Sequence, residues 1–252
     1  EDIIELLGVF GMKRDEPIIY QSERTEAYSA AEDRLRREAE LYPCFCTRAE
    51  LHSDGVVALP DGGILYPQTC RSLSNADIAA RMKKEQPSIR LAVPDEVIKF
   101  HDGIFGAQAQ ELARECGDFV IKRRDGIYSY QLAVVVDDGY SGVTEVVRGS
   151  DLLYDTPRQI YLQRLLGLPE PEYYHIPLVV NGNGKKLSKS DGDSAARLLK
   201  FKTAEQIIGA LAHAAGIADE PRPTTIDGLI HLYSADKISR SDIILPQSLE
   251  IR

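Results

Sequence analysis

Three of the four cysteines lie in one turn-rich segment of the sequence. Cys44-Phe45-Cys46 is followed by Cys70 within the run Tyr66-Pro67-Gln68-Thr69-Cys70-Arg71. Thiols one residue apart suit a metal better than a disulfide, and three converging thiols can bind a tetrahedral Zn²⁺ at a Zn–S distance of about 2.3 Å. Chemistry alone leaves the fourth ligand open among His52, Cys116, an acidic side chain and Tyr66. The alternative is a reduced cluster that packs as small apolar residues.

A second group of chemically capable residues occupies four runs in the second half of the chain: residues 118–126, 128–138, 143–153, and 175–180 continued by 184–190. The candidates are Tyr130, Arg148 and the loop Lys186-Leu187-Ser188-Lys189-Ser190. An arginine presents rigid paired donors that suit a carboxylate. A mobile loop of lysine and serine suits a triphosphate.

Each of these candidates also has an ordinary structural interpretation. Tyr130 beside an apolar run would be a core aromatic residue, and Arg148 at a strand end would be a surface or ion-pair arginine. The basic runs 122–124 and 185–189 would be solvated loops. Position favours function, because Arg148 and residues 186–190 both follow apolar strands, and open α/β sheets bind ligands at the carboxyl ends of their strands.

The elements that must position these residues follow from hydrophobic spacing. Helices are predicted at 1–13, ending near Gly11, then from about Ser22 to Tyr42, where Pro43 breaks the helix, and at 76–84 and 156–166. Strands are predicted at 17–20, 88–93, 97–101, 118–123, 143–147 and 176–180, and residues 130–136 are strongly apolar. Beyond Asp193 the pattern is helical, at 195–200, 204–215 and 225–232. Strands separated by helices predict an α/β fold with a parallel sheet.

The composition predicts a globular protein with a well-buried core. The chain has 252 residues, 43% of them hydrophobic, and a net charge of −9 at pH 7. No run reaches the roughly 18 apolar residues of a membrane span, and Glu1-Asp2-Ile3-Ile4 does not fit a secretory signal. Four cysteines are too few for a disulfide scaffold, so we expect a cytoplasmic protein without membrane contact. The acidic balance argues against non-specific nucleic-acid binding.

Taken together, these runs resemble class I aminoacyl-tRNA synthetases of the glutamyl type. Residues 186–190 are similar to the KMSKS loop of that class, with Leu187 in place of Met. The Cys-x-Cys and Tyr-x-x-x-Cys-Arg pattern is closer to one branch, the glutamyl-queuosine tRNA(Asp) synthetases, which are shortened paralogues of glutamyl-tRNA synthetase. The resemblance extends from residue 1 to about residue 200.

The resemblance implies a fold, a domain order and a set of site residues. The fold is a Rossmann-like parallel sheet whose halves lie at 1–42 and 116–192, with a zinc-containing insertion at 43–115 and a helical region at 193–252. Zinc would be structural, held by Cys44, Cys46, Tyr66 and Cys70, since a closed four-ligand site leaves no open position. Tyr130 and Arg148 would contact glutamate, and Lys186 and Lys189 would act at the phosphates, with Lys189 binding ATP.

The implied reaction is the ATP-dependent activation of glutamate, with Mg²⁺ accompanying the nucleotide, and transfer to the queuosine base of the tRNA(Asp) anticodon. The implied partners are glutamate, ATP and tRNA(Asp), and the implied state is a monomer. Residues 193–252 are too few for the large anticodon-binding domain of full glutamyl- and glutaminyl-tRNA synthetases.

Two departures from the family pattern leave alternatives open. The gap between Cys46 and Tyr66 is long for the branch, which predicts an enlarged zinc loop. The chain opens on a helix and has no glycine-rich phosphate loop, so the first strand, the HIGH-type element and the N-terminal Arg and Glu that help to hold glutamate are expected to precede residue 1. The alternatives are a truncated glutamyl-tRNA synthetase and a catalytically inactive, zinc-containing RNA-binding fragment.

Overall fold

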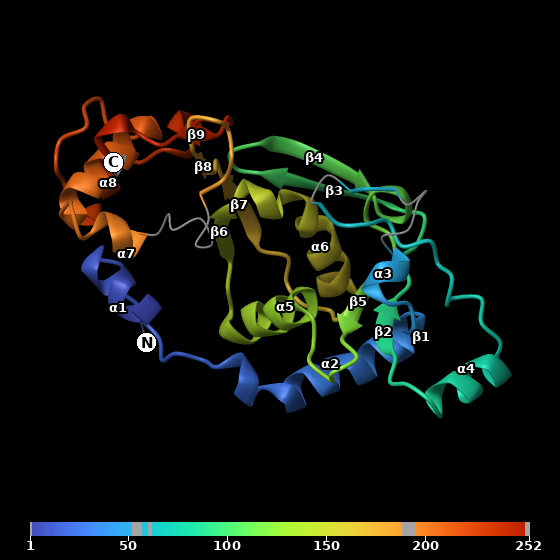
Figure 1. Ribbon diagram of the computed structural model, residues 1–252. Helices are drawn as coiled ribbons and strands as arrows, with labels where there is room; N and C mark the ends of the chain where they lie inside the picture. The colour runs from blue at the N-terminus through green and yellow to red at the C-terminus, as the bar shows by residue number, and fades with distance from the viewer. Residues whose placement is uncertain (1, 52–56, 60–61, 188–194, 250–252) are drawn as a thin grey trace.

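The sheet that organises the molecule has four strands in the order β4-β3-β7-β6, and lies above helices α5 and α6 (Figure 1). The computed structural model describes residues 2–51, 57–59, 62–187 and 195–249. The four strands are β3 (Val97–Asp102), β4 (Gly106–Glu111), β6 (Glu145–Gly149) and β7 (Glu172–Ile176). Strand β7 runs parallel to both β3 and β6, whereas β4 is an antiparallel edge strand on β3. The predicted α/β fold is therefore confirmed, with a mixed sheet.

Two smaller sheets complete the β structure. Strands β1 (Leu41–Cys44), β2 (Ser88–Leu91) and β5 (Phe119–Lys122) form an antiparallel sheet in the order β1-β2-β5. The short strands β8 (Val179–Val180) and β9 (Ile243–Ile244) pair in parallel. The segment predicted as an insertion therefore contributes β1 and β2 to the antiparallel sheet, and β3 and β4 to the central sheet.

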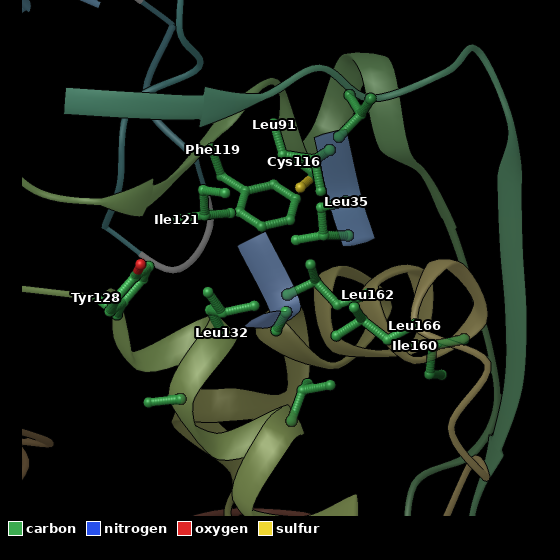
Figure 2. Close-up of a cluster of buried hydrophobic side chains, with 14 of the residues drawn as sticks. Leu35, Leu91, Cys116, Phe119, Ile121, Tyr128, Leu132, Ile160, Leu162 and Leu166 are labelled. Carbon is green, nitrogen blue, oxygen red and sulfur yellow. The ribbon is translucent and has the colours of Figure 1, made fainter. Parts of the chain in front are cut away.

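The main core is formed by three helices packed between the sheets: α2 (Thr25–Glu38), α5 (Tyr130–Ser141) and α6 (Thr156–Leu165). Helix α2 buries Tyr28, Ala31 and Leu35, which recur at the helical spacing that the sequence predicted. Figure 2 shows Leu35 among side chains from the antiparallel sheet and from α5 and α6. Its labelled neighbours include Leu91, Ile121, Leu132 and Leu162.

The remaining helices lie at the periphery. They are α1 (Asp2–Val9), α3 (Arg48–Leu51), α4 (Asn75–Met82), α7 (Ala195–Leu198), α8 (Ala204–Ala214) and α9 (Ile226–Leu229). Helix α8 begins with a capping box between Thr203 and Gln206. Phe10, just after α1, packs against the cluster of Ile207, Ala210 and Leu249, so the first helix lies beside the C-terminal helices (Figure 1).

Several predicted element boundaries are wrong for local reasons. The helix predicted to reach Tyr42 ends at Glu38, because Ala39 is extended and Pro43 lies within strand β1 rather than acting as a helix breaker. Residues 17–20 form no regular strand. The apolar run 130–136 is the first part of α5, and the predicted strand 176–180 is divided between β7 and β8. The edge strand β4, whose side chains are mostly polar or small, and the short β9 were not predicted.

Within the described residues, no helix is both long enough and apolar enough to cross a lipid bilayer.

Candidate functional site

The parallel pairing of β6 with β7 places Arg148 opposite His175 near the carboxyl ends of the two strands. The Nε of Arg148 donates a hydrogen bond of 3.0 Å to Nε2 of His175. Both residues therefore lie at the edge of the sheet where open α/β folds bind their ligands. The sequence predicted this position for Arg148 and assigned no role to His175.

The guanidinium of Arg148 is held by further acceptors from the segment that follows its own strand. Nη1 donates to Oε1 of Gln159 at 2.7 Å, and Nη2 donates to Oγ1 of Thr156 at 2.8 Å and to the carbonyl oxygen of Leu152 at 3.4 Å. Arg148 also lies over the ring of Tyr173, at 5.4 Å from its centroid. The side chain is thus oriented by the protein and is not a free surface arginine.

Tyr130 lies at the start of α5. Ser129 caps the helix by accepting a hydrogen bond from the backbone N of Leu132, so Tyr130 occupies the first helical position. The Tyr130 side chain is exposed, which excludes the core-aromatic interpretation. Its neighbour Gln131 accepts a hydrogen bond of 2.9 Å from Gln159, which in turn accepts one from Arg148.

The described part of the lysine loop approaches the same segment from β8. Lys186 forms an isolated bridge with Val180, and its Nζ makes an ion pair with the carboxylate of Asp151 in the 3₁₀ segment Ser150–Asp155. Gly149 leaves room for the Asp151 carboxylate in this position, since a Cβ there would meet its Oδ1 at 2.6 Å. Ser188, Lys189 and Ser190 lie outside the described residues.

Asp102 and His175 form a buried pair beneath Arg148. Their side chains are fully buried, and Nδ1 of His175 lies 2.6 Å from Oδ2 of Asp102. Burial lowers the pKa of His175, and the charge of Arg148 acts in the same direction, although the hydrogen bond with Asp102 opposes both. Sequence reasoning missed Asp102, Thr156 and Gln159, because only the fold brings them to Arg148.

The cysteine cluster lies where β1 ends. The Sγ atoms of Cys44, Cys46 and Cys70 all lie within 4.8 Å of one another, and those of Cys46 and Cys70 are 3.5 Å apart. The hydroxyl oxygen of Tyr66 is 3.4 Å from Sγ of Cys44 and 3.6 Å from Sγ of Cys46. Three sulfurs and one phenolic oxygen are therefore gathered around one point, and this donor set fits a tetrahedral divalent metal.

Two other candidates for the fourth ligand are Cys116 and His52. Cys116 is buried in the main core, where Nε of Arg158 contacts its sulfur at 2.9 Å, and it is not part of the three-cysteine group. His52 lies outside the described residues.

A buried cation faces the cysteine cluster. The guanidinium of Arg90 stacks on the ring of Tyr66, with its Cζ 3.8 Å from the centroid, and its Nη1 donates to the carbonyl oxygen of Asp118 at 2.8 Å. Burial alone would raise the pKa of the Cys44 thiol, but the hydrogen bond with Tyr66 and the hydrogen bond and charge of Arg90 lower it to about 7. Arg90 thus favours the thiolate that metal binding requires.

The basic run 122–124 has a structural role. Lys122 pairs with the buried Glu32, Arg123 with Asp125, and Arg124 contacts both Glu85 and the carbonyl oxygen of Phe45. Through these contacts the run is held by the rest of the protein, whereas its ordinary interpretation was a solvated loop.

Comparison with known families identifies the family of this chain. The family model for the catalytic domain of class I tRNA synthetases (E and Q) matches residues 1–208. The chain belongs to this family. The family predicted from the sequence is thereby confirmed.

Within the family, several curated relatives are named glutamyl-Q tRNA(Asp) synthetases. The one from Thiobacillus denitrificans is 50% identical over 190 residues, which cover 74% of this chain and 60% of the relative. The one from Burkholderia cenocepacia is 47% identical over 233 residues, covering 90% and 75%. The one from Pseudomonas entomophila is 46% identical over 204 residues, covering 78% and 64%. The chain thus spans 60% to 75% of the length of these relatives.

Solved structures of the family share the fold. The glutamate tRNA ligase of Elizabethkingia meningosepticum, solved with its amino acid, matches 98% of this chain and 57% of its own with a TM-score of 0.78. The glutamate-tRNA synthetase of Elizabethkingia anophelis gives a TM-score of 0.79 over 98% of this chain and 58% of its own. Both are 24% identical to this chain, so the likeness supports the fold alone.

Proposed function

We propose that this chain carries the catalytic site of a glutamyl-Q tRNA(Asp) synthetase, which activates glutamate with ATP and transfers it to the queuosine base of the tRNA(Asp) anticodon. One observation supports the site most directly. Arg148 donates to the carbonyl of Leu152 while Lys186 pairs with the adjacent Asp151, so the expected carboxylate-binding and phosphate-binding side chains meet one short segment. The curated relatives carry the same activity in their names.

Activation needs little covalent participation from the protein. The α-carboxylate of glutamate attacks the α-phosphorus of ATP, a new O–P bond forms, and the bond to pyrophosphate breaks. Arg148 and Tyr130 would hold glutamate, and Lys186 would exchange Asp151 for phosphate oxygens, with Lys189 beside them. Mg²⁺ that accompanies ATP supplies charge neutralisation. Catalysis then rests on positioning and on stabilising developing negative charge.

The cysteine cluster would hold a structural Zn²⁺ through Cys44, Cys46, Cys70 and Tyr66. The convergence of four donor atoms at the end of β1 supports this assignment. A four-ligand site has no vacant position for a substrate, so zinc would fix the surrounding segment rather than take part in the reaction.

The decisive test uses the full-length protein. Radiolabelled glutamate and ATP are supplied with tRNA(Asp) that carries queuosine, with tRNA(Asp) that lacks it, and with tRNA(Glu). We expect labelling of the queuosine-containing tRNA(Asp) alone. Charging of tRNA(Glu), with no labelling of tRNA(Asp), would instead identify a glutamyl-tRNA synthetase.

The activation step is tested separately by glutamate-dependent exchange of pyrophosphate into ATP. Lys186→Ala should reduce this exchange about tenfold to a hundredfold, because a charge-assisted contact to phosphate is lost. Lys185→Ala is the matched control, since it removes the neighbouring lysine of the same loop. An equal loss in both variants would argue against a specific role for Lys186.

A further inference from the structure

We propose that His175, itself fixed by Asp102, is a positioning residue that sets the direction of the Arg148 guanidinium. The inference rests on the proposed role of Arg148 in binding the glutamate carboxylate. It adds a buried Asp–His pair to the machinery, at a place where neither side chain can touch the substrate.

Asp102 is immobilised by a full set of donors. Its Oδ1 accepts from the backbone nitrogens of Ile104 at 3.0 Å and Phe105 at 2.8 Å, and its Oδ2 accepts from the backbone nitrogen of His175 at 3.1 Å. Oδ2 also meets Nδ1 of the His175 ring at 2.6 Å. A carboxylate held by these donors can only accept, so the proton of the neutral imidazole must lie on Nδ1.

This tautomer leaves Nε2 of His175 as an acceptor that faces Arg148. Arginine has donors alone, so the 3.0 Å contact from its Nε requires an unprotonated Nε2. Burial lowers the pKa of His175 and so favours the neutral imidazole that this contact needs. The order of donors and acceptors is therefore consistent from Asp102 through His175 to Arg148.

The Asp102–His175 pair restricts the orientation of the Arg148 guanidinium. Nε is turned toward His175, Nη2 toward Thr156 and the carbonyl of Leu152, and Nη1 uses one hydrogen for Gln159. Among the described residues, the second Nη1 hydrogen has no protein acceptor. Rotation of the fork would break the contact with His175, so the buried imidazole determines where this hydrogen points.

Two substitutions test the two ring nitrogens of His175 separately. The amide of His175→Gln reaches the position of Nε2 and can still accept from Arg148, whereas the amide of His175→Asn lies near Nδ1 and can still donate to Asp102. Each variant loses one buried hydrogen bond, so each provides a control for the stability of the other.

The readout is the KM for glutamate and for ATP in pyrophosphate exchange by the full-length protein, at a temperature where circular dichroism shows every variant folded. We expect His175→Asn to raise the KM for glutamate at least tenfold. The increase for His175→Gln should be at least threefold smaller, and the KM for ATP should be unchanged in both variants. Equal effects of the two variants on the glutamate KM, or no effect of either, would overturn the proposal.

A second measurement does not depend on activity. Nitrogen NMR of the protein labelled at histidine should show the His175 ring protonated on Nδ1, with an Nε2 resonance that shifts when Arg148→Ala removes its donor. A protonated Nε2, or no response to that substitution, would refute the positioning role. If the wild-type protein shows no glutamate-dependent exchange, the proposed function fails, and the NMR result still decides whether His175 orients Arg148.

Discussion

Arg148 is a candidate substrate ligand whose donors are already largely engaged by the protein. The sequence predicted its position, since a single arginine follows the apolar run 143–147. It could not predict the acceptors. Gln159 and Thr156 come from the next helix, and His175 comes from a strand 27 residues away. Hydrogen bonds between distant residues leave no mark in local spacing.

This engagement means that removal of Arg148 should affect folding as well as substrate binding. Arg148→Ala leaves Oε1 of Gln159 without its donor, and leaves the buried Nε2 of His175 with only the Thr156 hydroxyl, 3.3 Å away. A buried acceptor that loses its donor costs about 1 to 3 kcal/mol. We therefore expect Arg148→Ala to lower the free energy of unfolding in urea by about that amount, in addition to weakening glutamate activation. Unchanged stability would mean that these contacts are replaced by water at no cost.

A second prediction at the scale of single residues concerns the proposed metal ligands. Cys70→Ala should abolish zinc binding, measured by elemental analysis of the purified protein, because it removes one of three converging sulfurs. Cys116→Ala is the matched control, since that sulfur is equally buried but belongs to the main core. Full zinc content in the Cys70 variant would remove Cys70 from the ligand set. The spacing of the cysteines predicted the cluster, whereas Tyr66 was chosen on family resemblance.

Charged side chains link elements that are distant in the sequence. One of them, Lys122, belongs to a run whose ordinary interpretation was a solvated loop. Glu32 of α2 accepts hydrogen bonds from Lys122 of β5 at 3.0 Å, from Tyr128 at 2.9 Å and from Arg36. Periodicity predicted the buried face of α2 and most strands, but it placed the end of α2 too late and did not reveal this link. Element ends depend on competing local contacts, so they are less predictable than element type.

The Glu32 contacts predict how stability depends on pH. Burial by itself raises the pKa of Glu32, but its hydrogen bonds with Arg36, Lys122 and Tyr128 outweigh burial and lower it below its ordinary value of 4.5. Because the pKa is lower in the folded state, the contribution is present above about pH 4.5 and is lost as the pH falls through the folded-state pKa. Urea unfolding at pH 6 and pH 4 should show a smaller loss of stability for Glu32→Gln than for the wild type. Equal losses in both proteins would contradict this account.

At the scale of the whole molecule, the cysteine cluster is separate from the main core. Tyr42, Phe45 and Ala92 pack with the cluster cysteines, whereas α2, α5 and α6 surround Leu35. The sequence predicted the α/β class and the order of most elements. It could not predict the strand order β4-β3-β7-β6, because β3 and β7 are far apart in the sequence and a long crossover brings them together.

This separation predicts a local response to metal removal. Chelation should increase amide hydrogen exchange in residues 41–46 and 66–73, because the proposed metal would support this segment in place of a larger core. Exchange in α5 and α6 should change little, since their packing does not involve the cluster. Mass spectrometry of peptides before and after chelation provides the measurement. A uniform rise throughout the molecule would show that zinc supports the global fold.

The pairing of β8 with β9 brings a distant part of the polypeptide to the start of the Lys186 loop. Asp242 accepts from the backbone nitrogen of Leu178, 64 residues earlier, and Ile243 and Ile244 lie alongside the two residues that lead to the Lys186 loop. Proteolytic cleavage between residues 233 and 242 would leave the hydrogen bonds of Arg148 intact but would release the pairing of β9 with β8. Under the proposed function the Lys186 loop would then lose its anchor, so a cut in the helical C-terminal region would weaken ATP binding from a distance.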